Sequence, residues 1–120
     1  MHWYTAKRSH SKNILHYLDD FLFVGEVGTN QCANLLKTFT NVCQNWGVPL
    51  AEDKTVLPVE ILTFLGIEFD TIATELRLPK VKLIEIKQRI TVILGCKKVK
   101  LRELQSLIGL LNFACQVVVL

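Results

Sequence analysis

The sequence lacks the features typical of secreted, membrane-spanning and zinc-binding proteins. No apolar run opens the chain, so a signal peptide is not expected. The most apolar stretch, residues 104–120, is interrupted by polar side chains and predicts a buried helix rather than a membrane span. There is no CxxC pair and no histidine at ligand spacing from a cysteine, which argues against zinc. We therefore expect an intracellular protein, cytoplasmic or nuclear, with no membrane partner and with reduced cysteines.

Glycine- or serine-rich linkers, internal repeats and low-complexity segments are also missing. Of the 120 residues, 50% are hydrophobic and 21% are charged, which is typical of a folded chain. A chain of this length is expected to form one hydrophobic core, either as one domain or as part of a larger one.

Charge is distributed unevenly along the chain. Residues 1–12 carry three basic groups and no acid, and residues 13–76 carry two basic groups against nine acids. Residues 77–120 carry nine basic groups against two acids, which brings the net charge to +3. The acidic region suits cations and the basic region suits phosphates, although solvated surfaces have the same composition.

Hydrophobic periodicity predicts an α+β fold with the order strand, strand, helix, strand, strand, helix, helix. The first two strands are expected to turn at Asp19-Asp20. The turn of the second pair is expected at residues 70–74. The strands are expected at residues 14–18, 21–25, 61–69 and 75–78.

The helices are predicted from apolar residues at three- and four-residue spacing. Thr29 or Asn30 caps the first and Gly47 ends it, Pro79 opens the second, and the third begins near Leu101. Their expected buried side chains are Cys32, Leu35, Leu36, Phe39, Val42, Cys43 and Trp46, then Leu83, Ile86, Ile90, Ile93 and Leu94, then Leu104, Leu107, Ile108, Leu111 and Cys115.

Two adjacent carboxylates, Asp19 and Asp20, lie between apolar strands. Because like charges on a tight turn repel each other, a divalent cation is expected to stabilise the pair. Hard oxygen ligands favour Mg²⁺ or Mn²⁺, and such sites support phosphoryl transfer. A solvated polar turn without any metal remains the alternative.

The segment at residues 14–25 resembles the YxDD hairpin of reverse transcriptases, with Tyr17-Leu18-Asp19-Asp20 as the motif. The motif sequences resemble those of DIRS-like retrotransposon enzymes more than those of retroviral polymerases. Downstream segments resemble, in order, the lysine loop, the primer grip, the strand that enters the thumb and the first long thumb helix of the family. These segments are Trp46-Gly47 with Asp53-Lys54, Phe64-Leu65-Gly66, Leu76-Arg77-Leu78-Pro79, and residues 104–116.

The resemblance implies that residues 14–79 form the C-terminal part of a polymerase palm and residues 80–120 the start of a helical thumb. Residues 1–13 are an extension that does not match. Another palm aspartate and the nucleotide-selecting segment are expected upstream of the motif, and residues 1–13 contain no acidic group.

The resemblance also implies roles for individual residues. Asp19 and Asp20 are the expected catalytic metal ligands, with Mg²⁺ (or Mn²⁺) as the cofactor. Lys54 is the expected general acid toward the pyrophosphate leaving group. Its alternative role is a loop lysine paired with Glu52 or Asp53.

The expected contacts to primer and template come from three places. Tyr17 and Leu18 would lie against the primer–template end, and Leu65 and Gly66 would form the primer grip, with an ordinary strand and bulge glycine as the alternative. On the thumb helix, one band about 80° wide carries the expected minor-groove contacts. For the Phe113 ring in this band, packing in the core is the alternative. That band consists of Arg102, Gln105, Gly109, Phe113 and Gln116.

The function that follows is a fragment of an RNA-directed DNA polymerase, a nucleotidyltransferase that extends a primer with dNTPs and is expected to be inactive alone. Its partners would be an RNA or DNA template with primer, and the rest of a polyprotein with ribonuclease H and recombinase or integrase domains. One alternative is a non-catalytic remnant that still binds primer–template. Another is an intracellular helical-hairpin protein whose Asp19-Asp20 turn is incidental.

Overall fold

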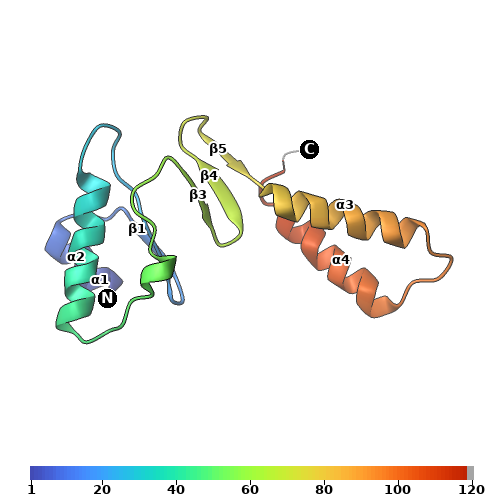
Figure 1. The fold of residues 1–120 in the computed structure, drawn as a ribbon, viewed down its shortest axis with the longest axis horizontal. Helices are drawn as coiled ribbons and strands as arrows, with labels where there is room; N and C mark the ends of the chain where they lie inside the picture. The colour runs from blue at the N-terminus through green and yellow to red at the C-terminus, as the bar shows by residue number, and fades with distance from the viewer. Residues whose placement is uncertain (119–120) are drawn as a thin grey trace. The chain divides into compact units, whose positions relative to one another are not determined.

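The computed structural model describes residues 1–118 and confirms the α+β class. The chain forms two compact units, residues 1–59 and residues 60–120, in place of the single core expected from its length. Each unit has its own sheet and helices, and Figure 1 labels most of these elements. Within residues 1–118, no helix combines the length and the apolar character needed to cross a membrane.

The first unit places a two-stranded antiparallel sheet against a helix. Its elements are α1 (His2–Ser9), β1 (Ile14–Tyr17), β2 (Asp20–Phe23), α2 (Gln31–Asn45) and a 3₁₀ turn, η1 (Glu52–Lys54).

The core of this unit lies between α2 and one face of the hairpin. Phe39 of α2 packs against Phe21 and Phe23, with ring centroids 4.5 and 5.2 Å apart. Leu35, Val42 and Cys43 of the predicted apolar stripe are also buried. Aromatic contacts from Phe39 therefore hold β2 against α2.

Gly25 sets the approach of β2 to α2. A Cβ atom at residue 25 would lie 2.5 Å from the backbone nitrogen of Cys32, so only glycine fits this position. The connection between hairpin and helix is therefore tight, and it fixes the hairpin relative to α2.

The helix α1 was not predicted from the sequence. Residues 2–9 are mostly polar, yet Thr5 is completely buried. Tyr4 packs on Trp46 with ring centroids 4.9 Å apart, and a His2–His16 hydrogen bond joins the helix to β1. Tertiary contacts therefore stabilise this helix, which is too short to be stable alone.

The second unit consists of an antiparallel three-stranded sheet and a helical hairpin. Its elements are β3 (Ile61–Phe64), β4 (Ile67–Asp70), β5 (Glu75–Arg77), α3 (Lys80–Leu94) and α4 (Leu101–Ala114). The prediction of one long strand at residues 61–69 is wrong, because that run folds back on itself.

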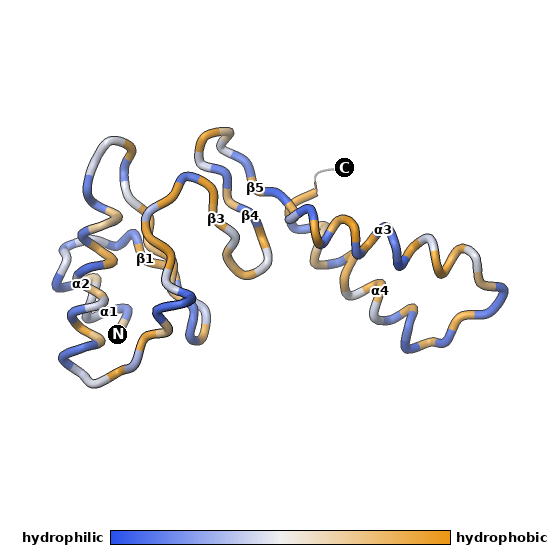
Figure 2. Tube along the Cα trace, in the orientation of Figure 1, coloured by the Kyte–Doolittle hydropathy of each residue, from blue (hydrophilic) through white to orange (hydrophobic). Residues whose placement is uncertain are grey.

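The core of the second unit is formed by Leu78, Ile86 and Ala114, with Phe113 packed against it. On α4 the buried residues are Leu107 and Ala114, whereas Leu104, Ile108 and Leu111 of the predicted stripe are 41%, 48% and 36% exposed. Leu107 is therefore buried as predicted, but at 100° per residue the centre of the buried side lies about 65° from the centre of the predicted stripe. The alternation of apolar and polar residues along α3 and α4 is visible in Figure 2.

Four further burial predictions are wrong. Trp46 at the end of α2 is 51% exposed, Leu83 and Leu94 of α3 are exposed, and so is Cys115 just after α4. In contrast, Cys43 is buried as expected, and that burial raises the pKa of its thiol. Cys43 is therefore a protonated core residue.

Candidate functional site

The YxDD-like hairpin turns one residue earlier than predicted. Tyr17 pairs with Asp20 across the strands, so Leu18 and Asp19 form the two-residue turn and Asp20 opens β2. Leu18 has a φ of 51°, in the left-handed region that leucine rarely adopts. Strained backbone of this kind is concentrated at functional sites.

The two faces of this hairpin differ. His16 and Phe21 share the face that packs toward α2, because Phe21 contacts Phe39. Tyr17 and Asp20 share the other face, where the Tyr17 side chain is 59% exposed. Asp20 therefore projects beside an exposed tyrosine.

Asp19 and Asp20 are both exposed at the hairpin tip. Among residues 1–118, no group of three histidine, cysteine, aspartate or glutamate side chains gathers closely enough to hold a metal ion. Two carboxylates supply hard oxygen ligands that suit Mg²⁺, but a hydrated ion held by them alone would bind weakly. The tip therefore fits part of a magnesium site and does not complete one.

Lys54 ends η1 and is exposed. In the part of the chain that the structure describes, no ion pair joins Lys54 to Glu52 or Asp53. Its backbone N–H donates to the carbonyl of Ala51 at 3.1 Å, which closes the 3₁₀ turn. The ammonium group is thus free of the two acids that the alternative role required.

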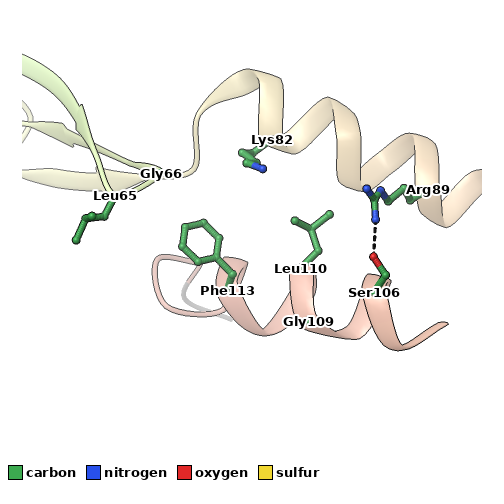
Figure 3. A pocket seen from close by; sticks show the side chains of 8 residues that line it. All are labelled: Leu65, Gly66, Lys82, Arg89, Ser106, Gly109, Leu110 and Phe113. Atoms are coloured by element: carbon green, nitrogen blue, oxygen red, sulfur yellow. Dashed lines mark hydrogen bonds between the residues drawn. The ribbon is translucent and has the colours of Figure 1, made fainter. Parts of the chain in front are cut away.

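In the second unit, four of the residues predicted to contact primer and template meet in one pocket of about 450 Å³ (Figure 3). Leu65 and Gly66 come from the β3–β4 turn, and Gly109 and Phe113 come from α4. These two pairs are more than forty positions apart in the sequence. The rest of the lining is Lys82, Arg89, Ser106 and Leu110.

Leu65 and Gly66 form the two-residue turn between β3 and β4, so the strand-with-bulge alternative is wrong. Their φ angles are 52° and 77°, as in a type I′ turn, which asparagine followed by glycine favours. A Cβ at residue 66 would lie 3.0 Å from Cζ of Phe113. Gly66 is therefore required both by its φ and by the approach of the Phe113 ring.

Phe113 extends from α4 toward the β3–β4 turn (Figure 3). It is half-buried and packs against the core cluster that contains Leu78 and Ala114. The core-packing alternative for this ring is therefore present in the structure. One ring both closes the core and lines the pocket.

Gly109 and Gln105 occupy more open positions. A Cβ at Gly109 would meet no atom within 4 Å, so this side of α4 is accessible to a ligand backbone. Gln105 is exposed and lies outside the pocket lining. The predicted band on α4 is thus divided between the pocket and the surface beside it.

Sequence reasoning missed the polar residues Lys82, Arg89 and Ser106. Lys82 and Arg89 are seven positions apart and therefore lie on one face of α3, which was the available signal. Their pairing with Ser106 depends on how α3 meets α4, which periodicity does not determine. Arg89 donates a hydrogen bond to Ser106 Oγ at 2.9 Å, drawn in Figure 3.

No protein-family model, no curated protein and no solved structure matches the chain.

Proposed function

We propose that the chain is part of a reverse transcriptase, an RNA-directed DNA polymerase, and that it contributes palm and thumb surfaces that hold the primer–template duplex. Under this proposal, residues 14–79 belong to the palm and residues 80–120 to the thumb. Its substrates would be a primed RNA or DNA template and, in the intact enzyme, dNTPs.

The observation that carries the proposal is the shared pocket of the second unit. The residues that resemble a primer grip, Leu65 and Gly66, line this pocket together with Gly109 and Phe113, which belong to the band of expected minor-groove contacts on the thumb helix. The two segments lie far apart in the sequence, and their resemblance to the family does not depend on where they lie in space. A surface with an aromatic ring, an open helix backbone and cations suits a nucleic-acid strand.

The hairpin of the first unit would supply metal ligands. Asp19 and Asp20 would hold Mg²⁺, which would lower the barrier to phosphoryl transfer by stabilising charge on the transferred group. Further ligands are needed, because these two carboxylates form only part of a site. Tyr17, exposed beside Asp20, would contact the primer end.

The binding part of the proposal is tested with a fluorescent DNA primer annealed to an RNA template and with the purified chain. Fluorescence anisotropy should show salt-sensitive binding, because phosphate contacts release counterions. Gln105→Ala should weaken binding by about fivefold, since a hydrogen bond in the groove is worth roughly 1 kcal/mol.

The matched control is Gln88→Ala, which removes the same exposed amide from α3, at a position that neither lines the pocket nor belongs to the predicted band on α4. This variant should bind as the unchanged chain does. Equal losses in both variants, or no binding by the unchanged chain, would contradict the proposed surface.

A second candidate function is a non-catalytic remnant that still holds primer–template. The observation that favours it is the absence, among residues 1–118, of a complete group of metal ligands at the hairpin. Primer extension with primed RNA, dNTPs and Mg²⁺ separates the two candidates. Extension that Asp19→Asn abolishes would exclude the remnant, and binding without extension would favour it.

A further inference from the structure

The pocket of the second unit has an unassigned polar end formed by Lys82, Arg89 and Ser106. It contains two cations and a hydroxyl, and no carboxylate is among the described residues that line it. Arg89 comes from α3 and Ser106 from α4, so the two helices contribute jointly. None of these three residues belongs to the primer–template contacts predicted from the sequence.

Both cations are occupied by one acid on the same helix. Glu85 Oε1 lies 3.0 Å from Arg89 Nη2, and Glu85 Oε2 lies 3.3 Å from Lys82 Nζ. Each carboxylate oxygen therefore holds one cation, at helical spacings of three and four residues. All three side chains are about 35–45% exposed.

Donors remain available after these contacts are made. The guanidinium of Arg89 has five N–H groups and the ammonium of Lys82 has three, more than their contacts to Glu85 and Ser106 use. Ser106 accepts from Arg89, so its own O–H is available to donate. One helical turn away, Gly109 leaves the surface of α4 open.

We propose that Lys82, Arg89 and Ser106 form a binding site for one backbone phosphate of a nucleic-acid strand, and that Glu85 sets its affinity by competing for both cations. The proposal rests on the function proposed above, because it places the strand in this pocket. A phosphate would replace Glu85 on Arg89 and Lys82, and the Ser106 hydroxyl would donate a third hydrogen bond.

A phosphate group can compete with the Glu85 carboxylate for Arg89 and Lys82. Ion pairs between exposed side chains are weak, so the contacts to Glu85 resist displacement only slightly. Hydrogen bonds from a guanidinium to phosphate oxygens are charge-assisted and geometrically matched. Lys82, Arg89 and Glu85 together carry a net charge of +1. Neutralising Glu85 would raise this local net charge to +2.

The test compares two variants that remove one negative charge from the same unit. Glu85→Gln frees both cations, whereas Glu103→Gln makes the same change at an exposed position of α4 that forms no ion pair among the described residues. We expect Glu85→Gln to tighten primer–template binding roughly threefold to fivefold at low salt, and Glu103→Gln to change it by less than about 1.5-fold.

The complementary pair removes one positive charge from α3. Arg89→Gln should weaken binding about tenfold and lower the slope of log affinity against log salt by about one. Lys87→Gln is the control, because Lys87 is exposed on the same helix and lies outside the pocket lining. Circular dichroism checks that each variant keeps the helix content of the unchanged chain.

The outcomes separate the two proposals. If the unchanged chain binds and Glu85→Gln tightens binding no more than Glu103→Gln does, the phosphate site is wrong and the proposed function stands. The same holds if Arg89→Gln and Lys87→Gln weaken binding equally. If the unchanged chain and all variants fail to bind, both proposals are wrong.

Discussion

At the scale of single residues, the molecule places leucines where turns favour other side chains. Leu18 and Leu65 are exposed at hairpin turns and have φ angles of 51° and 52°. Left-handed backbone costs an ordinary L-residue roughly 1–2 kcal/mol. Neither leucine gains a buried environment in exchange, which is consistent with a role in contacting a ligand.

Leu65→Asn should therefore stabilise the second unit. Asparagine followed by Gly66 is the preferred sequence of a type I′ turn, and we expect a gain of about 1 kcal/mol. The gain in stability should appear as slower hydrogen exchange at the backbone amides of β3 and β4. The same variant should bind primer–template less tightly, and a loss of stability would contradict the assigned turn geometry.

A second residue-scale prediction concerns Thr5. Its side chain is completely buried, and its Oγ1 has no hydrogen-bond partner among the described residues. Because an unpaired buried hydroxyl is costly, Thr5→Val should raise the free energy of unfolding by about 1 kcal/mol. Urea denaturation followed by fluorescence of Trp3 and Trp46, both in the same unit, measures the change.

The control for that experiment is Thr38→Val on α2. The hydroxyl of Thr38 donates to the carbonyl of Asn34 at 2.8 Å, so the same substitution removes a hydrogen bond that exists. Its unfolding free energy should stay the same or fall slightly. A similar gain in both variants would mean that valine itself, and not the unpaired hydroxyl of Thr5, is responsible.

At the scale of elements, the turn between β4 and β5 is organised by one carboxylate. Asp70 Oδ1 accepts hydrogen bonds from the N–H groups of Ile72 and Ala73 at 3.0 and 2.9 Å, and Oδ2 accepts one from Arg77. The Ala73 N–H contributes most to lowering the pKa of Asp70, and Arg77 lowers it further against the opposing effect of burial. The ionised form therefore holds the turn.

This arrangement makes the sheet sensitive to acid. Because the folded-state pKa of Asp70 lies below its ordinary value of 3.8, the ionised group stabilises the fold above that value. The contribution is lost as the pH falls through the lower, folded-state pKa. The thermal midpoint of the second unit should therefore decline below about pH 4, and Asp70→Asn should be less stable at pH 7 and decline less.

Glu75→Gln is the matched comparison. Glu75 is 60% exposed, and its oxygen lies 3.9 Å from Arg77, so its contribution is small. The acid-dependent decline should persist in this variant. If Asp70→Asn showed the same decline as the unchanged chain, the assignment to Asp70 would be wrong.

Sequence reasoning located α2 and the starts of α3 and α4 to within a residue or two, because an apolar stripe and its end signals are local. It missed the β3–β4 turn, since Leu65 carries no turn signal and a single glycine within a β-prone run is equally typical of a bulge, the alternative given for Gly66. It also missed which side of α4 is buried. That side is chosen by α3 and by the β3–β4 turn, and the apolar pattern of α4 alone does not contain this information.

In the candidate sites, too, features determined by local sequence were predicted and features determined by tertiary packing were not. Asp19 and Asp20 at a hairpin, and Leu65, Gly66, Gly109 and Phe113 as separate candidates, could be chosen from the sequence, but the shared pocket of the last four could not. The Arg89–Ser106 contact could not be predicted either, because it depends on a tertiary register between two helices.

At the scale of the whole molecule, charge is unequal between the units. The first unit contains five basic and five acidic residues, whereas the second contains nine basic and six acidic ones. The net charge of +3 therefore resides in residues 60–120. This is also the unit with the pocket.

Binding to primer–template should consequently depend on salt through a small number of phosphates. A footprint of three phosphates gives a log–log slope near −2.7 and a loss of roughly 40-fold between 50 and 200 mM monovalent salt. Anisotropy titrations at four salt concentrations measure the slope. A slope near zero would exclude phosphate contacts as the main source of affinity.

Gly109 has a consequence for laboratory evolution. Its position in the middle of α4 is open, and alanine there would add helix stability of roughly 0.5–1 kcal/mol without a clash. A library selected only for heat resistance would therefore be enriched in alanine at this position. If α4 lies against a nucleic-acid strand, the methyl group of alanine at this position would occupy space that the strand needs. Selecting for binding as well as heat resistance would therefore retain glycine.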